Sequence, residues 1–169
     1  VLLTMFSRNT NLLLAFLRDH NTARSVLDVF NGLYAMFGRE TYCRLFPVIL
    51  TDRGSEFSNP VPIEQDENDE LRSLVFYCNP SAPYQKGGIE VAHELVRRVL
   101  PKGKSFDDLQ QEDIDLMLSH INSYKRGKLN SRSAYQLFNF IYGDDILPKL
   151  NIREIEANDI VLSPKLLKK

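Results

Sequence analysis

The sequence has no apolar run long enough to cross a membrane. Its longest apolar pieces, such as Leu12 to Leu17, fall far below the roughly 20 residues that a spanning helix needs. It has no Cys-X-X-Cys pair either, because Cys43 and Cys78 lie at unrelated positions. Such cysteines predict reduced thiols of a cytosolic protein, and they leave no zinc site to propose. Internal repeats and low-complexity tracts are also absent.

The composition is that of an ordinary globular protein. The chain has 169 residues, of which 43% are hydrophobic and 25% charged, and its net charge is -1. This length suits a single domain with a proper core. The charges are unevenly placed, with an acidic run at residues 64–70 and a later part rich in Lys and Arg. A basic half can bind phosphates, or it can be a solvated face, and charge alone leaves both readings open.

The order of the expected elements is that of an α/β protein. Two apolar runs across the turn Ser7 to Thr10 predict a hairpin, and a helix capped by Thr22 is expected to close at Gly38. Further elements are expected along the chain: a short helix in the acidic segment ending near Arg72, a strand at Leu74 to Tyr77, a helix at Ile89 to Leu100, helical structure from Ser105, a helix at Ala134 to Ile141, and a tail from Gly143 with turns and weak strand signals.

The stretch Val48 to Phe57 is the first candidate for a functional site. An apolar run stops at Thr51-Asp52 and is followed at once by a glycine, which predicts a buried strand that ends in a turn with a carboxylate at its tip. Open α/β sheets place their chemistry at this end of a strand. An Asp before a turn also serves as a cap or an Asx-turn, so both readings stand on these residues alone.

A second candidate follows the loop from Asn79 to Gly88. Glu90 falls in the first turn of the next predicted helix, where the helix dipole favours an anion. Glu94 and Arg97 lie on the same face as Glu90, since separations of four and seven residues return near one azimuth. A capping carboxylate with a surface neighbour is the alternative interpretation.

Four ordered segments together resemble the integrase core of bacterial insertion-sequence transposases. Those enzymes carry three motifs in this order: TDNGSEF, then PY followed by RGxxE, then LLRRxxPKG. An arginine-rich turn before a helix follows the third motif. The matching segments here are Thr51-Asp-Arg-Gly-Ser-Glu-Phe57, Pro83 to Glu90, Leu95 to Gly103 and Asn122 to Phe138. The resemblance covers residues 1–138.

This resemblance implies an RNase H-like α/β fold, in which a mixed five-stranded sheet is flanked by helices. It implies residues 1–142 as the catalytic core and residues 143–169 as a C-terminal extension. It also implies a DDE set of carboxylates, in which Asp52 matches the second member and Glu90 the third. These two residues are then the catalytic and metal-binding residues. Two Mg²⁺ or Mn²⁺ ions are expected in the complete site, because hard cations favour carboxylate oxygens.

The implied activity is DNA cleavage and strand transfer by in-line attack on phosphodiesters during transposition and DNA integration. The partners are then transposon ends and target DNA, bound by a homo-oligomer in the bacterial cytoplasm, at the nucleoid, and not at a membrane. Arg97 matches a basic residue that holds DNA phosphate near the site. The residues expected to contact DNA without reading its sequence are Lys86, Arg97, Arg98, Lys125 and Arg126.

The sequence departs from the family pattern at defined positions. The first acidic residue belongs on a strand before the hairpin, and neither Asp19 nor Asp28 can replace it. We therefore expect an N-terminally truncated fragment that is inactive alone. Arg53 stands where the family has Asn, and Lys86 stands where it has Arg. Two alternatives stay open: a catalytically dead DNA-binding remnant of a mobile element, and a nuclease of the same fold.

Overall fold

A computed structural model of the chain describes residues 1–167, without the side chains of residues 83 and 86. It divides into two compact units, and each is described by itself. The first consists of Val1 and Arg18–Lys86, and the second of Leu2–Leu17 and Gly87–Lys169. Helices and strands occur in both units, so the α/β class expected from the sequence is confirmed. The expected boundary at residue 142 stays a prediction.

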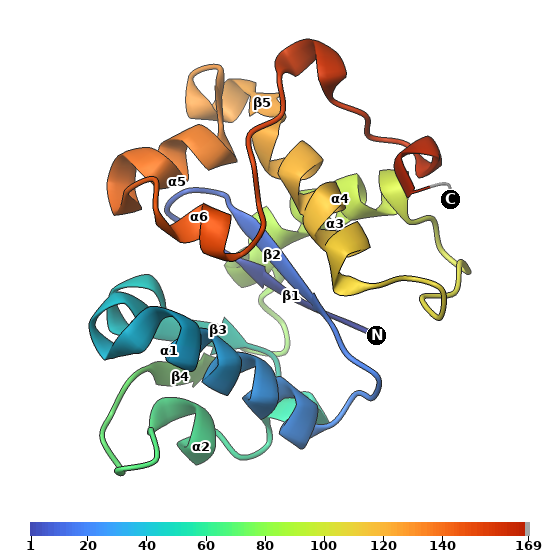
Figure 1. Ribbon diagram of the computed structural model, residues 1–169. Coiled ribbons are helices and arrows are strands. Elements are labelled where there is room, and N and C mark those ends of the chain that lie inside the picture. The colour runs from blue at the N-terminus through green and yellow to red at the C-terminus, as the bar shows by residue number, and fades with distance from the viewer. Residues whose placement is uncertain (168–169) are drawn as a thin grey trace. The chain divides into compact units, whose positions relative to one another are not determined.

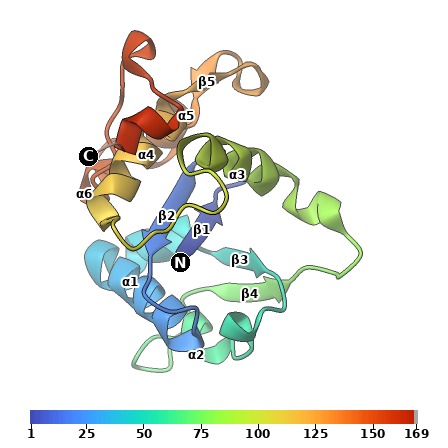
Figure 2. The ribbon, with the colours of Figure 1, turned by 90° about the vertical axis from the view of Figure 1, so that its right-hand side faces the viewer.

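The first unit is built around a pair of parallel strands. Its elements in chain order are α1 (Ala23–Leu45), β3 (Val48–Thr51), η1 (Ser55–Phe57), α2 (Val61–Glu64), β4 (Leu74–Tyr77) and η2 (Pro83–Lys86). The arrows of β3 and β4 run side by side in the same direction in Figure 2, with Val48 opposite Leu74 and Thr51 opposite Tyr77. The two strands therefore end together, at the edge where Asp52 follows β3.

Helix α1 begins where the sequence predicts. The Thr22 side chain accepts a hydrogen bond from the backbone N–H of Ser25, and the Ser25 side chain completes the capping box. Gly38 has a φ of 77° and breaks the helical conformation, which glycine does at little cost. The chain then turns helical again and continues to Leu45. Gly38 thus ends the first helical segment, as the sequence predicts, and the prediction missed only the second helical segment that follows it.

Two expectations for the first unit need correction. The β3 strand is only half-buried, since Val48 is 56% exposed and Leu50 is 40% exposed while Thr51 is buried. Helix α2 ends at Glu64, well before the end near Arg72 that the sequence predicts. Asp66 explains this early end, because its Oδ1 accepts the backbone N–H groups of Asn68 and Glu70. Such a turn competes with the helix for the backbone donors.

The second unit joins a hairpin to a group of helices. Its elements are β1 (Leu2–Phe6), β2 (Leu13–Leu17), α3 (Gly87–Val99), α4 (Gln111–Ser123), β5 (Lys125–Arg126), η3 (Gly127–Leu129), β6 (Arg132–Ser133), α5 (Ala134–Tyr142), α6 (Ile146–Lys149), η4 (Ala157–Asp159) and η5 (Pro164–Leu167). The antiparallel pairing of β1 with β2 confirms the expected hairpin. Helix α3 contacts β1, and α4 packs along β2 (Figure 1).

The helices of the second unit differ from expectation at their ends. The segment from Ser105 was expected to be helical, but α4 begins only at Gln111. The Asp113 carboxylate fixes this start, because it accepts the backbone N–H of Gln110 at 2.9 Å. In the described tail, residues 143–167, the weak strand signals correspond to α6 and to short 3-10 turns. Helix α5 extends one residue beyond the expected end at Ile141.

The strands hydrogen-bond in pairs. Among the described residues β1 pairs with β2, β3 with β4, and β5 with β6, and no larger sheet is formed. The single five-stranded sheet implied by the resemblance therefore has no counterpart in these pairings. None of the described helices combines the length and the apolar character needed to cross a bilayer.

Candidate functional site

Asp52 lies at the surface, directly after the last residue of β3. Its Oδ1 accepts the backbone N–H of Gly54 at 3.1 Å. This bond makes the Asx-turn that the sequence left open as an alternative. The turn also fixes where the carboxylate points, at the carboxyl end of a parallel strand pair. Asp52 therefore stabilises the turn and also presents an exposed carboxylate at the end of the strand.

A second carboxylate, that of Glu56, lies over the same turn. A Cβ added to Gly54 would come within 2.6 Å of Glu56 Oε2, so the carboxylate of Glu56 lies directly against this glycine. Burial lowers the pKa of the Arg18 guanidinium, and the nearby charge of Glu56 acts in the opposite direction. Glu56 is not among the site residues predicted from the sequence. Its position in the segment Thr51 to Phe57, four residues after Asp52, is the signal that could have pointed to it.

The turn after Asp52 is held from two sides. Phe57, the last residue of η1, is buried, and η1 packs on α1. The Tyr77 hydroxyl donates a hydrogen bond to the Phe57 carbonyl. Tyr77 itself pairs with Thr51 in the strand register. The end of β4 thus anchors the loop that carries Asp52 and Glu56.

Glu90 is exposed in the first turn of α3. The start of this helix rests on β1 at two points. A Cβ added to Gly88 would lie 2.2 Å from the Phe6 ring, so glycine is needed for the helix to approach the strand. One turn beyond Glu90, the His93 ring shares a 2.9 Å hydrogen bond with the Thr4 hydroxyl. These contacts fix the face of α3 on which Glu90 lies.

Arg97 and Arg98 are exposed near the end of α3. Arg97 lines a hollow of about 270 Å³ together with Lys102 and Lys104. Its other lining residues are His93, Val96, Leu100, Pro101, Gly103 and Phe106, and none of the nine is a carboxylate. A concave surface with three cations and no acidic side chain suits an anionic group such as a phosphate.

The remaining predicted DNA contacts lie in the hairpin after α4. Lys125 is exposed and Arg126 is half-buried in β5. Burial lowers the pKa of Arg126. Nε and Nη2 of its guanidinium are buried and have no hydrogen-bond partner among the described residues. The side chain of Lys86 lies outside the described part of the structure, so its expected DNA contact stays a prediction.

The second unit brings Glu90 and Arg97 onto one helix, about 10 Å apart along its axis. Asp52 belongs to the first unit and Glu90 to the second, and their meeting at one site stays a prediction. Within residues 1–167 no group of three His, Cys, Asp or Glu side chains lies close enough to hold a metal ion.

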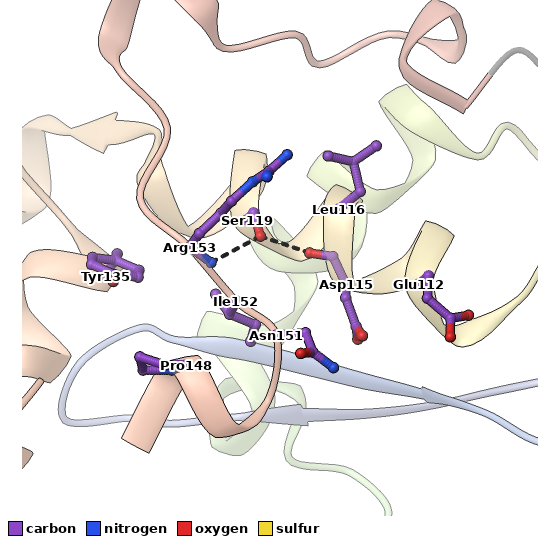
Figure 3. Close-up of a pocket in the computed structure, with 9 residues that line it drawn as sticks. All are labelled: Glu112, Asp115, Leu116, Ser119, Tyr135, Pro148, Asn151, Ile152 and Arg153. Atoms are coloured by element: carbon purple, nitrogen blue, oxygen red, sulfur yellow. Dashed lines mark hydrogen bonds between the residues drawn. The ribbon is translucent and has the colours of Figure 1, made fainter. Parts of the chain in front are cut away.

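A larger hollow, of about 570 Å³, lies in the second unit beside α4 (Figure 3). Asp115 lies in its wall, and burial raises the pKa of this carboxylate while a hydrogen bond from Gln111 acts against the rise. One turn further along α4, the Ser119 hydroxyl accepts the backbone N–H of Arg153 and donates to the Asp115 carbonyl (Figure 3). None of the predicted site residues lines this hollow.

No model of a known protein family matches the sequence. Individual proteins do match it. Over 120 residues the chain is 29% identical to the ORF3 protein of Spiroplasma virus SpV1-R8A2 B, which is named as an integrase; the match covers 71% of this chain and 35% of that protein. Over 63 residues it is 35% identical to the transposase for insertion sequence element IS1086 of Cupriavidus metallidurans, covering 37% of this chain and 19% of the relative.

A third relative is the transposase for insertion sequence element IS4351 of Bacteroides fragilis. It is 27% identical over 94 residues, which cover 56% of this chain and 28% of that transposase. The chain is therefore transposase/integrase-like, in the sense that it is similar to transposases of insertion sequences and to a viral integrase. This transposase-like chain spans about a third or less of the length of these three relatives.

Proposed function

We propose that this chain contributes the catalytic carboxylates of a DDE transposase with an RNase H-like fold, which cleaves DNA and joins its ends to a target. The observation that carries the proposal is the arrangement of α3. Its first turn presents an exposed carboxylate, Glu90, and its last turn presents Arg97 at the wall of a basic hollow. A phosphodiester that reacts beside Glu90 would find cations within two helical turns.

The donor set fits Mg²⁺ or Mn²⁺. Asp52 and Glu90 are exposed carboxylates, and carboxylate oxygens are the ligands these ions prefer. We propose that both residues hold the metal ions. When bound, the ions would activate the attacking oxygen and stabilise the leaving oxygen of an in-line displacement. Arg97, with Lys102 and Lys104, would bind the neighbouring phosphate and keep the DNA strand in register with the carboxylates.

The outer edge of β1 supports the expectation of a further carboxylate. Ser7 donates its backbone N–H to the Leu12 carbonyl, so odd-numbered residues of β1 face β2. Leu2, Thr4 and Phe6 therefore turn their backbone groups to the other edge, where they have no backbone partner among the described residues. A strand paired with this edge would be the place for the first acidic residue that the resemblance implies.

Metal-directed backbone cleavage tests whether Asp52 and Glu90 share a metal. Fe²⁺ that replaces Mg²⁺ produces hydroxyl radicals with ascorbate and peroxide, and these cut the chain near the bound ion. We expect cuts close to both residue 52 and residue 90, and we expect D52N to weaken the cuts at both places. The matched control is E94Q, which removes an exposed carboxylate one turn further along α3 and should leave the pattern unchanged. Cuts at one position only, or a pattern insensitive to D52N, would overturn the proposal.

A further inference from the structure

The hairpin after α4 concentrates positively charged side chains. We call residues 125–133 the basic hairpin; its cations are Lys125, Arg126, Lys128 and Arg132. Arg126 and Arg132 stand directly opposite each other in the β5–β6 register. Among the described residues no carboxylate forms an ion pair with any of the four cations. Like charges on opposite positions of a strand pair destabilise it, so the basic hairpin gains stability when an anion lies between them.

The Arg126 guanidinium also has hydrogen-bond donors that could bind an anion. Its Nε and Nη2 are buried and lack an acceptor among the described residues. A buried donor without an acceptor costs free energy, and a charged donor costs more. A phosphate oxygen from a ligand would satisfy these groups, since guanidinium groups bind phosphate through paired hydrogen bonds.

An exposed aromatic ring lies beside these cations. Phe140 of α5 is 80% exposed, whereas Phe138 on the same helix is buried. The Arg132 guanidinium lies over the Phe140 ring, with Cζ 6.0 Å from the ring centroid. This cation–π contact orients the ring but leaves most of it open to solvent.

We propose that the basic hairpin and Phe140 form a binding site for nucleic acid with an unpaired base. Arg126 and Arg132 hold the backbone phosphates, and the base stacks on the open part of the Phe140 ring. Bases of any sequence have a face that stacks on an aromatic side chain, so this contact needs no particular base. The surrounding cations favour a polyanion over an apolar protein surface as the occupant. The inference rests on the proposed function, because it assumes that the chain binds DNA.

The chain contains no tryptophan, so F140W introduces a single fluorescent reporter at the proposed contact. We expect its emission to be quenched by a duplex oligonucleotide that carries three unpaired nucleotides at one end, and to change little with the same duplex made blunt. In anisotropy titrations of the full 169-residue chain, F140A should bind the extended duplex about tenfold more weakly than the wild type. Its affinity for the blunt duplex should change less than about twofold.

The control is the neighbouring residue Ile141, which is 48% exposed on the same helix. I141A should keep the wild-type preference for the extended duplex, and I141W should show no selective quenching. An unquenched F140W together with equal binding of both duplexes by wild type and F140A would overturn the stacking site and leave DNA binding intact. A change of sedimentation in F140A without a change in DNA affinity would assign Phe140 to a protein interface and overturn the inference. Failure of the wild type to bind either duplex would overturn both this inference and the DNA binding on which it rests.

Discussion

Asn122 of α4 hydrogen-bonds both backbone groups of Leu13 in β2. The Leu13 N–H donates to Asn122 Oδ1 at 2.9 Å, and Asn122 Nδ2 donates to the Leu13 carbonyl at 2.8 Å. Gln111, at the other end of α4, accepts the Leu17 N–H and donates to the Ala15 carbonyl. Two amide side chains thus occupy the outer edge of β2 as a neighbouring strand would. This edge is closed to pairing with another chain.

Replacing Asn122 with alanine should therefore destabilise the second unit strongly. Asn122 is fully buried, so N122A leaves the N–H and the carbonyl of Leu13 without partners, at roughly 1–3 kcal/mol for each group. We expect urea unfolding to show a loss of about 2–5 kcal/mol. N158A, which truncates an exposed Asn in η4, should change the free energy of unfolding by less than about 0.5 kcal/mol. Equal stability of N122A and N158A would contradict this role.

Sequence patterns predicted the elements whose signals are local. The hairpin follows from two apolar runs across a turn, and the start of α1 follows from Thr22 and the spacing behind it. The surface position of Asp52 at a strand end follows from the apolar run and the glycine that bracket it. Each of these signals lies within a few residues of the structure it predicts.

The remaining features depend on contacts between distant residues. Asn122 reaches Leu13 across 109 positions of the chain, and in the sequence it resembles any polar residue at a helix end. The position of the Glu56 carboxylate over the turn is seen only in the folded chain, where this side chain lies against Gly54. The early end of α2 likewise depends on a turn that Asp66 stabilises. No periodicity encodes such pairings.

Arg72 should be the main polar anchor of the first unit. It is buried, and its guanidinium lies over the rings of Tyr34 and Tyr42. It also donates to the carbonyls of Ile63 and Pro62 and to the Asn31 side chain. R72A removes all of these contacts, and we expect a loss of roughly 3 kcal/mol in the free energy of unfolding.

Two variants check this assignment of Arg72. R72K keeps the charge but not the planar fork, so it should restore only part of the stability. R24A removes an exposed ion pair with Asp28 and should cost less than about 1 kcal/mol. The assignment fails if R72A unfolds at the same urea concentration as R24A.

His120 should make the second unit less stable in mild acid. Its Nδ1 accepts the backbone N–H of Val161 at 3.0 Å, which requires an unprotonated Nδ1. Burial lowers the pKa of His120, the Arg153 charge lowers it further, and Asp159 opposes both. Below the ordinary histidine pKa of about 6.5 the unfolded chain takes up a proton that the folded chain resists. The free energy of unfolding therefore falls as the pH drops from 6.5 towards the lowered folded pKa.

Urea titrations at a series of pH values measure this effect. H120Q removes the titrating ring and should flatten the dependence between pH 7 and pH 5. H20Q, which replaces an exposed histidine, should retain the slope of the wild type. An identical slope in H120Q and the wild type would remove His120 as its source.

Arg97 should contribute to DNA affinity through phosphate contact alone. R97A takes one cation from the hollow that it shares with Lys102 and Lys104. We expect weaker binding of every duplex sequence by a similar factor, and a salt dependence whose slope is smaller by about one. K149A, which removes an exposed cation from α6, is the control and should leave the slope unchanged. A loss confined to one DNA sequence would instead indicate base recognition by Arg97.

Residues 1–169 alone should not join a labelled donor end to target DNA in Mg²⁺ or Mn²⁺. A two-ion site needs carboxylates that bridge both ions, and the resemblance assigns only Asp52 and Glu90 of this chain to such a site. Asp52 and Glu90 without a third carboxylate should bind divalent ions weakly, because each lost ligand leaves charge on the ions uncompensated. Gel analysis of the labelled products measures joining and cutting separately. Cut ends without joined products would favour a nuclease of the same fold, and joined products would show that the third carboxylate is dispensable.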